Sequence, residues 1–220
     1  MLAHDEQAAY QESVDNVRRT VERYLVSHMT KLSVIDFVSN LQHGVSRVFS
    51  AAIEQGVPVA CKVGCSHCCH ARVEATAPEI FRIARELESR PIDELSEIIQ
   101  CLKANVASTI EPTAWSQRRA CPFLTNNLCV VYDKRPKVCR SAHSLDVRKC
   151  ETDAEEIPQD LGVVVRVKAL TKGTSEGYKN LGFDSTAYEL GAAVLLALTD
   201  ASAEARWFSG EAVFLADKTE

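Results

Sequence analysis

Eight of the nine cysteines fall into two groups of four, and their spacing is that of metal ligands. The first group is Cys61-x3-Cys65-x2-Cys68-Cys69, and the second contains Cys121, Cys129, Cys139 and Cys150. Thiolates two to four residues apart can reach one ion from a single tight turn, as in structural zinc sites and iron–sulfur clusters. The sequence therefore predicts a metal centre. We interpret the ninth, Cys101, as a small buried residue of an amphipathic helix.

The redox compartment decides between metal ligands and disulfides. The first residues are polar and acidic, and no basic segment precedes an apolar one, so we expect no signal peptide and a cytoplasmic protein. The longest apolar run, at 190–198, is about half of the length that a bilayer requires, which predicts no membrane span. In a reducing cytosol, clustered cysteines indicate metal or redox chemistry rather than disulfides.

Charge is distributed unevenly along the chain. The 220 residues carry a net charge of -5, which argues against a general nucleic-acid binder. Around the second group, however, the charge is positive, and positive charge favours thiolates. The basic residues there are Arg118, Arg119, Lys134, Arg135, Lys137, Arg140, Arg148 and Lys149, opposed by Asp133 and Asp146.

The elements that position the cysteines are predicted to be mostly helical. Apolar residues recur at helical spacing over 5–28 and 33–55, and Pro91 begins a further helix. The capping boxes Thr76-x-x-Glu79 and Thr186-x-x-Glu189 predict helices to about 88 and 199. A short helix is expected over 203–208. In the stretch 163–181, residues 163–165 could form a strand, and the rest fits a helix interrupted near Gly173.

The stretch 111–158 contains all of the second group but has no sustained periodicity, so we expect a metal centre to order it. These patterns predict a mainly α fold, a helical domain with an irregular cysteine-rich metal-binding lobe. The predicted boundaries are N-terminal helices at 1–57, a cysteine-cluster metal-binding domain at 58–158, and C-terminal helices at 159–220 packing on the same domain.

Several short motifs coincide with a known family. After the first group come Cys121-Pro122-Phe123-Leu124, Cys129-Val130-Val131-Tyr132, Arg135-Pro136 and Cys139-Arg140. This pattern resembles the YkgJ-type cysteine-cluster family, or CxxCxxCC domain, described as zinc- or iron-chelating; the flagellin lysine-N-methylase FliB carries a similar domain. The first spacing is x3 here instead of x2. The resemblance implies a metal centre held by up to eight cysteines: Cys61, Cys65, Cys68, Cys69, Cys121, Cys129, Cys139 and Cys150.

The identity of the metal stays open between zinc and iron. Eight thiolates suit two zinc ions or one iron–sulfur cluster, and Cys-x3-Cys-x2-Cys tilts the choice towards the cluster. His67 and His70 are alternative ligands that we expect to be solvated instead. His143 could donate a hydrogen bond near the ligands, but we expect it at the surface.

Residues around the cysteines are predicted to support the site. Glu79 either caps its helix, contributes to the metal site, or does both. Arg135 and Arg140 are expected to donate to the thiolates, and Phe123 and Tyr132 to cover them. Asp146 is expected to pair with Arg140 or Arg148.

Three functions are compatible with such a centre. The first is a metal-binding module whose metal is structural or is delivered elsewhere. The second is a metal- or cluster-dependent enzyme related to protein lysine N-methylation, and the third is a redox or metal sensor with Cys68-Cys69 as the switch. The predicted partner is a metal ion. The sequence names no protein partner and no reaction.

Overall fold

The computed structural model describes residues 4–107, 119–152 and 154–214, and the fold is mainly α, as predicted. The chain forms two compact units, each built from two segments. Unit 1 comprises Met1–Cys61 and Arg140–Ser185, and unit 2 comprises Lys62–Cys139 and Thr186–Glu220. The boundaries at 57 and 158 remain a prediction. Within the described residues, no helix has the length and hydrophobicity that a membrane span requires.

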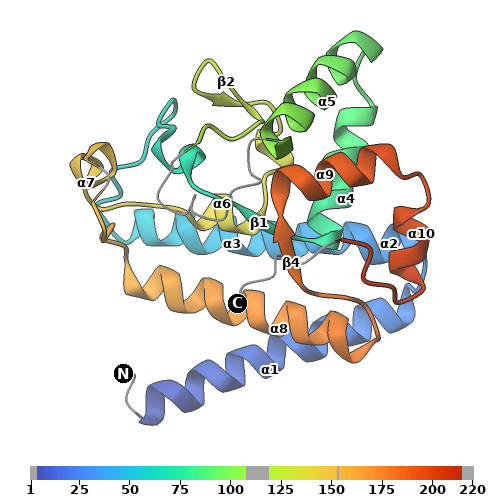
Figure 1. The fold of residues 1–220 in the computed structure, drawn as a ribbon. Coiled ribbons are helices and arrows are strands. Elements are labelled where there is room, and N and C mark those ends of the chain that lie inside the picture. The colour runs from blue at the N-terminus through green and yellow to red at the C-terminus, as the bar shows by residue number, and fades with distance from the viewer. Residues whose placement is uncertain (1–3, 108–118, 153, 215–220) are drawn as a thin grey trace. The chain divides into compact units, whose positions relative to one another are not determined.

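Two long helices form the base of unit 1. Helix α1 (His4–Ser27) packs along α8 (Leu161–Asn180), as Figure 1 shows. Gly173 and Gly177 let the two backbones approach, because a Cβ at Gly173 would lie 2.5 Å from the Val14 carbonyl oxygen and one at Gly177 would lie 2.7 Å from the Val21 Cβ. The expected interruption near Gly173 is therefore wrong: α8 is continuous there, and the glycine is a packing site.

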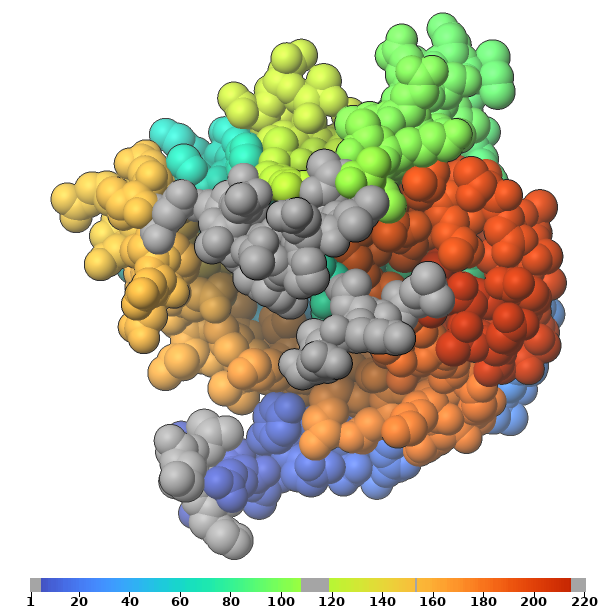
Figure 2. All heavy atoms as spheres, viewed as in Figure 1, coloured from blue at the N-terminus to red at the C-terminus, as the bar shows by residue number. Residues whose placement is uncertain are grey.

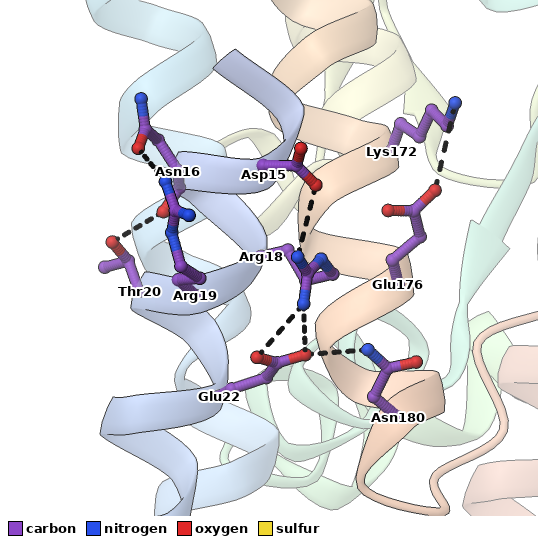
Figure 3. Close-up of polar contacts among 9 residues, drawn as sticks. All are labelled: Asp15, Asn16, Arg18, Arg19, Thr20, Glu22, Lys172, Glu176 and Asn180. Carbon is purple, nitrogen blue, oxygen red and sulfur yellow. Dashed lines mark hydrogen bonds and ion pairs between the residues drawn. The ribbon is translucent and has the colours of Figure 1, made fainter. Parts of the chain in front are cut away.

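Polar contacts reinforce the same helix pair. Arg18 donates to Glu22 and to Asp15 within α1, and Asn180 of α8 donates to Glu22 at 2.7 Å. Figure 3 shows these side chains converging between the two helices. Glu22 is thus hydrogen-bonded from both helices, and these bonds hold the pKa of its carboxyl below the usual value, with the Asn180 bond as the largest cause.

The predicted helix over 33–55 is divided in two. Helix α2 (Lys31–Asp36) is capped by the Thr30 hydroxyl, and α3 (Val38–Glu54) follows after Phe37. Phe37 retains helical backbone angles, so α3 follows α2 without an intervening loop. The core of unit 1 joins α3 to α8 and contains Val38, Leu41, Val45, Ala52, Val163 and Val167. A short helix, α7 (Val147–Glu151), precedes α8.

Unit 2 is organised around a two-stranded antiparallel sheet. Strand β1 (Glu74–Thr76) pairs with β4 (Ala187–Glu189), and each strand leads directly into a helix. These helices are α4 (Ala77–Glu88) and α9 (Leu190–Thr199); α5 (Ile92–Ala107) packs on α9, and α10 (Ala203–Phe208) follows it. The core is aromatic, since Phe81 contacts both Trp207 and Phe214.

The second predicted capping box is wrong, whereas the first is confirmed. Thr76 and Glu79 form the box at the start of α4. At the other site the residues after Thr186 are strand β4, and Glu189 is itself the N-cap of α9, accepting from the amides of Gly191 and Ala192. The pairing of β4 with β1, 113 residues away along the chain at the Ala75–Tyr188 position, overrides the local helix signal.

The described part of 111–158 contains several short elements. They are β2 (Leu124–Thr125), β3 (Leu128–Cys129), the 3₁₀ turn η3 (Tyr132–Lys134), α6 (Lys137–Ser141) and α7. Figure 2 shows the β2–β3 hairpin, in yellow-green, beside the turquoise segment that holds the first cysteine group of unit 2.

We expect Gly173→Ala to destabilise unit 1 by about 1–3 kcal/mol, because the new methyl group would collide with the backbone of α1. Gly44→Ala in α3 is the matched control, since its Cβ would meet only the flexible end of Leu170 at 3.4 Å. Helix propensity alone favours alanine at both positions by up to about 1 kcal/mol. Urea denaturation followed by circular dichroism measures both, and equal midpoints would contradict the close packing.

Candidate metal centre

The first cysteine group lies in a tight loop that ends in a 3₁₀ turn. Gly64 adopts a φ of +83°, a conformation that favours glycine, and the Cys65 amide donates to the Lys62 carbonyl. The turn η1 (His67–His70) then contains both adjacent cysteines, and the Cys69 amide donates to the Ser66 carbonyl. The loop geometry therefore places Cys65, Cys68 and Cys69 within one compact segment.

Backbone hydrogen bonds join the second group to this loop. The Cys121 amide donates to the Cys69 carbonyl at 2.7 Å, and the Arg119 amide donates to the His70 carbonyl at 3.0 Å. The Ser66 hydroxyl also donates to the Asn127 side chain. Because the first of these bonds joins two cysteine residues, it brings Cys121 of the second group into direct contact with Cys69 of the first.

A β-hairpin places Cys129. Strands β2 and β3 pair Leu124 with Cys129, and the connection is Asn126-Asn127, with φ values of 51° and 61°. Positive φ at both central residues is what a two-residue type I′ turn requires, and asparagine tolerates it. This hairpin was not predicted, although two asparagines between Leu124-Thr125 and Leu128-Cys129 are a readable signal.

Cys139 is held by a contact between helices. It lies in α6, whose first amide, that of Lys137, donates to Glu79 Oε1 at 2.6 Å. Glu79 is fully buried, and its other oxygen accepts from the Thr76 amide and hydroxyl. The predicted capping role of Glu79 is confirmed, and the residue also binds the segment that carries Cys139.

Burial governs the ionisation of three thiols. Loss of hydration raises the pKa of Cys121 to about 11 and that of Cys139 to about 12, and it raises the pKa of Cys129 as well. Two backbone amides oppose this effect, since those of Phe123 and Val131 donate to the sulfurs of Cys121 and Cys129. An amide directed at sulfur stabilises a thiolate, so the chain supplies donors for the charged form.

The thiols of unit 2 also change one another's pKa values. Negative charge on Cys121, Cys129 or Cys139 raises the pKa of Cys69, whereas a hydrogen bond with Cys68, the largest effect, lowers it. Cys139 interacts in the same way with Cys68, Cys121 and Cys129. Five cysteines are thus each coupled to at least two of the others: Cys68, Cys69, Cys121, Cys129 and Cys139. Their charges repel, and a cation would relieve that repulsion.

The predicted ligands are distributed over both units. Six of the eight belong to unit 2, while Cys61 and Cys150 belong to unit 1. All nine cysteines are reduced thiols. Within residues 4–107, 119–152 and 154–214, no three His, Cys, Asp or Glu side chains converge closely enough to hold a metal ion. The thiols are therefore neighbours rather than an assembled cage.

Cys101 differs from its expected role. It was expected to be buried, yet it is exposed on α5 and its thiol donates to the Pro122 carbonyl at 3.7 Å. The side chain turns out from the helix towards the segment that follows Cys121, and it interacts electrostatically with that cysteine.

Other predicted neighbours are partly as expected. Phe123 is 1% exposed, whereas Tyr132 is 58% exposed and stacks under the Arg135 guanidinium at 3.6 Å. Arg135 lowers the pKa of Cys129 electrostatically, as expected of a cation beside a thiol. Arg140 donates to the Ser46 hydroxyl.

Two further expectations concern unit 1. His143 is buried rather than at the surface: its Nε2 accepts from the Asp160 amide, and its Nδ1 lies 2.8 Å from the Ser141 carbonyl oxygen. Asp146 pairs with Arg148 at 3.5 Å, as predicted. Arg118, of the basic residues counted above, lies outside the described residues.

Comparison with protein families identifies the cysteine-rich segment. Residues 60–158, a little under half of the chain, match the family CxxCxxCC, described as "Putative zinc- or iron-chelating domain". The cysteine-rich segment is thus similar to that domain. Its two groups of thiols and the amides directed at sulfur fit the thiophilic metals of that description. No curated protein and no solved structure matched the chain.

The metal-free protein should lose stability at alkaline pH. Cys121 and Cys139 have folded-state pKa values of about 11 and 12, above the unfolded value of about 8.5, so their contribution is complete below about pH 8.5 and is lost as pH rises towards 12. Urea midpoints between pH 7.5 and 10.5, with a chelator and a phosphine reductant, measure this loss. Cys139→Ser should flatten the dependence and Cys101→Ser should not; parallel curves for all three proteins would refute the assignment.

Proposed function

We propose that this protein chelates zinc or iron through the thiolates of its CxxCxxCC domain. The proposal rests on the electrostatic coupling among five cysteines of unit 2, which are Cys68, Cys69, Cys121, Cys129 and Cys139. Four or more sulfur donors suit zinc and iron–sulfur centres and poorly suit magnesium or calcium, which prefer oxygen.

The energetics of the thiols support a cation. Burying a sulfur that must ionise is unfavourable, and several thiolates together repel one another. A divalent metal removes both costs, because it displaces the thiol protons and neutralises the charges. The Arg135 guanidinium and the amides of Phe123 and Val131 act in the same direction on Cys129 and Cys121. The chain thus supplies the donors that a metal–thiolate centre requires.

The proposed ligand set extends beyond the coupled five. Cys65 lies in the same loop as Cys68 and Cys69, and its turn is shaped by Gly64. Cys61 and Cys150 complete the eight proposed ligands. Because there are more than four cysteine ligands, the site could hold two zinc ions with shared or separate thiolates, or one iron–sulfur cluster with additional thiols nearby.

A redox or metal sensor is the second candidate, and one observation favours it. Cys68 is exposed, and its hydrogen bond lowers the pKa of the neighbouring Cys69. An exposed thiol beside one whose pKa is lowered is the arrangement in which oxidation is selective. Reversible loss of metal after mild peroxide treatment, reversed by a thiol reductant, would favour the sensor over a permanently loaded module.

Metal content decides the proposal. We expect protein purified without oxygen to contain zinc or iron, measured per chain together with acid-labile sulfide. Iron with matching sulfide identifies a cluster, whereas zinc without sulfide identifies a chelating module. Protein that has neither metal, and that takes up neither after reduction and anaerobic incubation, would overturn the proposal.

Single substitutions should separate ligands from the remaining thiol. Cys139→Ser and Cys65→Ser should lose metal, and the loss should lower the thermal midpoint, since structural zinc contributes about 10–16 kcal/mol in small peptides. Cys101→Ser should keep the wild-type content. Equal content in all three variants would contradict the assignment of the ligands.

A further inference from the structure

Glu79 makes more contacts than a helix cap requires. The side chain is 0% exposed, in a position where an unpartnered carboxyl group would be strongly unfavourable. Oε2 accepts from the Thr76 amide at 3.1 Å and from the Thr76 hydroxyl at 3.0 Å, which completes the capping box of α4. Oε1 is not used by the cap, and it accepts from the Lys137 amide at 2.6 Å.

This second bond links two distant parts of unit 2. Lys137 is 58 residues after Glu79 and is the first residue of α6. Cys139 follows two residues later, where it interacts electrostatically with Cys68, Cys121, Cys129 and Glu79. The N-terminus of α4 follows the first cysteine group through β1, so Glu79 connects the elements that carry the two groups.

We propose that Glu79 is a positioning residue of the metal centre: its carboxyl group fixes α6 to the start of α4 and so holds Cys139 beside the thiols of the other segments. This inference rests on the proposed metal chelation. It assigns Glu79 no bond to the metal, because both oxygens are already occupied by backbone and hydroxyl donors. The carboxyl group is specific for this task, since each oxygen must accept a bond and an amide offers only one acceptor.

The first test compares metal affinity in matched variants. Glu79→Gln keeps the size but directs an NH₂ group at a donor, so zinc or iron should bind about 10–100-fold more weakly. Lys137→Pro deletes the amide that Glu79 binds, together with the lysine side chain, at a first helical position that tolerates proline, and should have the same effect. Glu88→Gln, an exposed carboxyl on the same helix, is the control and should leave affinity unchanged.

Competition with a chromophoric chelator measures these affinities. Co²⁺ substitution reports the geometry, since sulfur-to-cobalt absorption weakens when a thiolate is lost. The variants Glu79→Gln and Lys137→Pro should reduce that absorption, and Glu88→Gln should not. Circular dichroism shows whether each variant is folded. If either Glu79→Gln or Lys137→Pro fails to fold, the affinity of the other variant decides the result.

The second test needs no metal. In the metal-free protein, Cys139 should react slowly with iodoacetamide because it is only partly exposed, and Glu79→Gln and Lys137→Pro should accelerate its alkylation while leaving that of exposed Cys101 unchanged. Peptide mass spectrometry resolves the two sites. If the wild-type protein binds metal, and both variants show the wild-type metal affinity and the wild-type rate of Cys139 alkylation, the role of Glu79 is overturned while the proposed function stands. Wild-type protein that binds no metal would overturn the proposed function, and the alkylation rates would still decide whether Glu79 positions Cys139.

Discussion

Backbone hydrogen bonds hold the cysteine segments of unit 2 together. The Cys121 amide bonds to the Cys69 carbonyl, and the Arg119 amide bonds to that of His70. Apolar burial contributes as well, since Phe123 and Val131 beside the second group are buried. The directional bonds determine which sulfurs can meet. The hairpin at Cys129 and the α6 segment at Cys139 follow the same principle, because each is fixed by main-chain donors.

The two units are stabilised by different kinds of contact. In unit 1, glycines at 173 and 177 allow α1 and α8 to touch, and an aliphatic core joins α3 to α8. In unit 2, Phe81, Trp207 and Phe214 form an aromatic core on one part of the fold, while the cysteine segments depend on polar contacts. Glu79 connects these two parts of unit 2, because it lies at the buried start of α4 and its carboxyl group binds the amide at the start of α6.

Sequence patterns predicted the features that are local. Periodicity located α1 and α4, and cysteine spacing singled out the thiols, because both signals lie within a few residues. Features that depend on distant partners were missed: β4 is a strand because β1 pairs with it, and Gly173 is a contact because α1 lies against it. The spacing of Cys121 and Cys129 could not show that the amides of Phe123 and Val131 point at sulfur, since that requires the turn geometry. The Asn126-Asn127 turn was local and readable, but it was overlooked within a stretch without periodicity.

The interleaving of the two units along the chain has a consequence for dissecting the protein. A fragment cut at the limits of the family match, 60–158, would contain the whole first segment of unit 2 but not β4, α9 or α10. It would expose Phe81 where Trp207 and Phe214 now cover it, and it would leave β1 as an unpaired edge. During synthesis, likewise, the ribosome releases every cysteine before it releases the strand and helices that complete unit 2. The cysteines therefore leave the ribosome before unit 2 can complete its fold. The family match, 60–158, lacks the second segment of unit 2, which must also fold around the first.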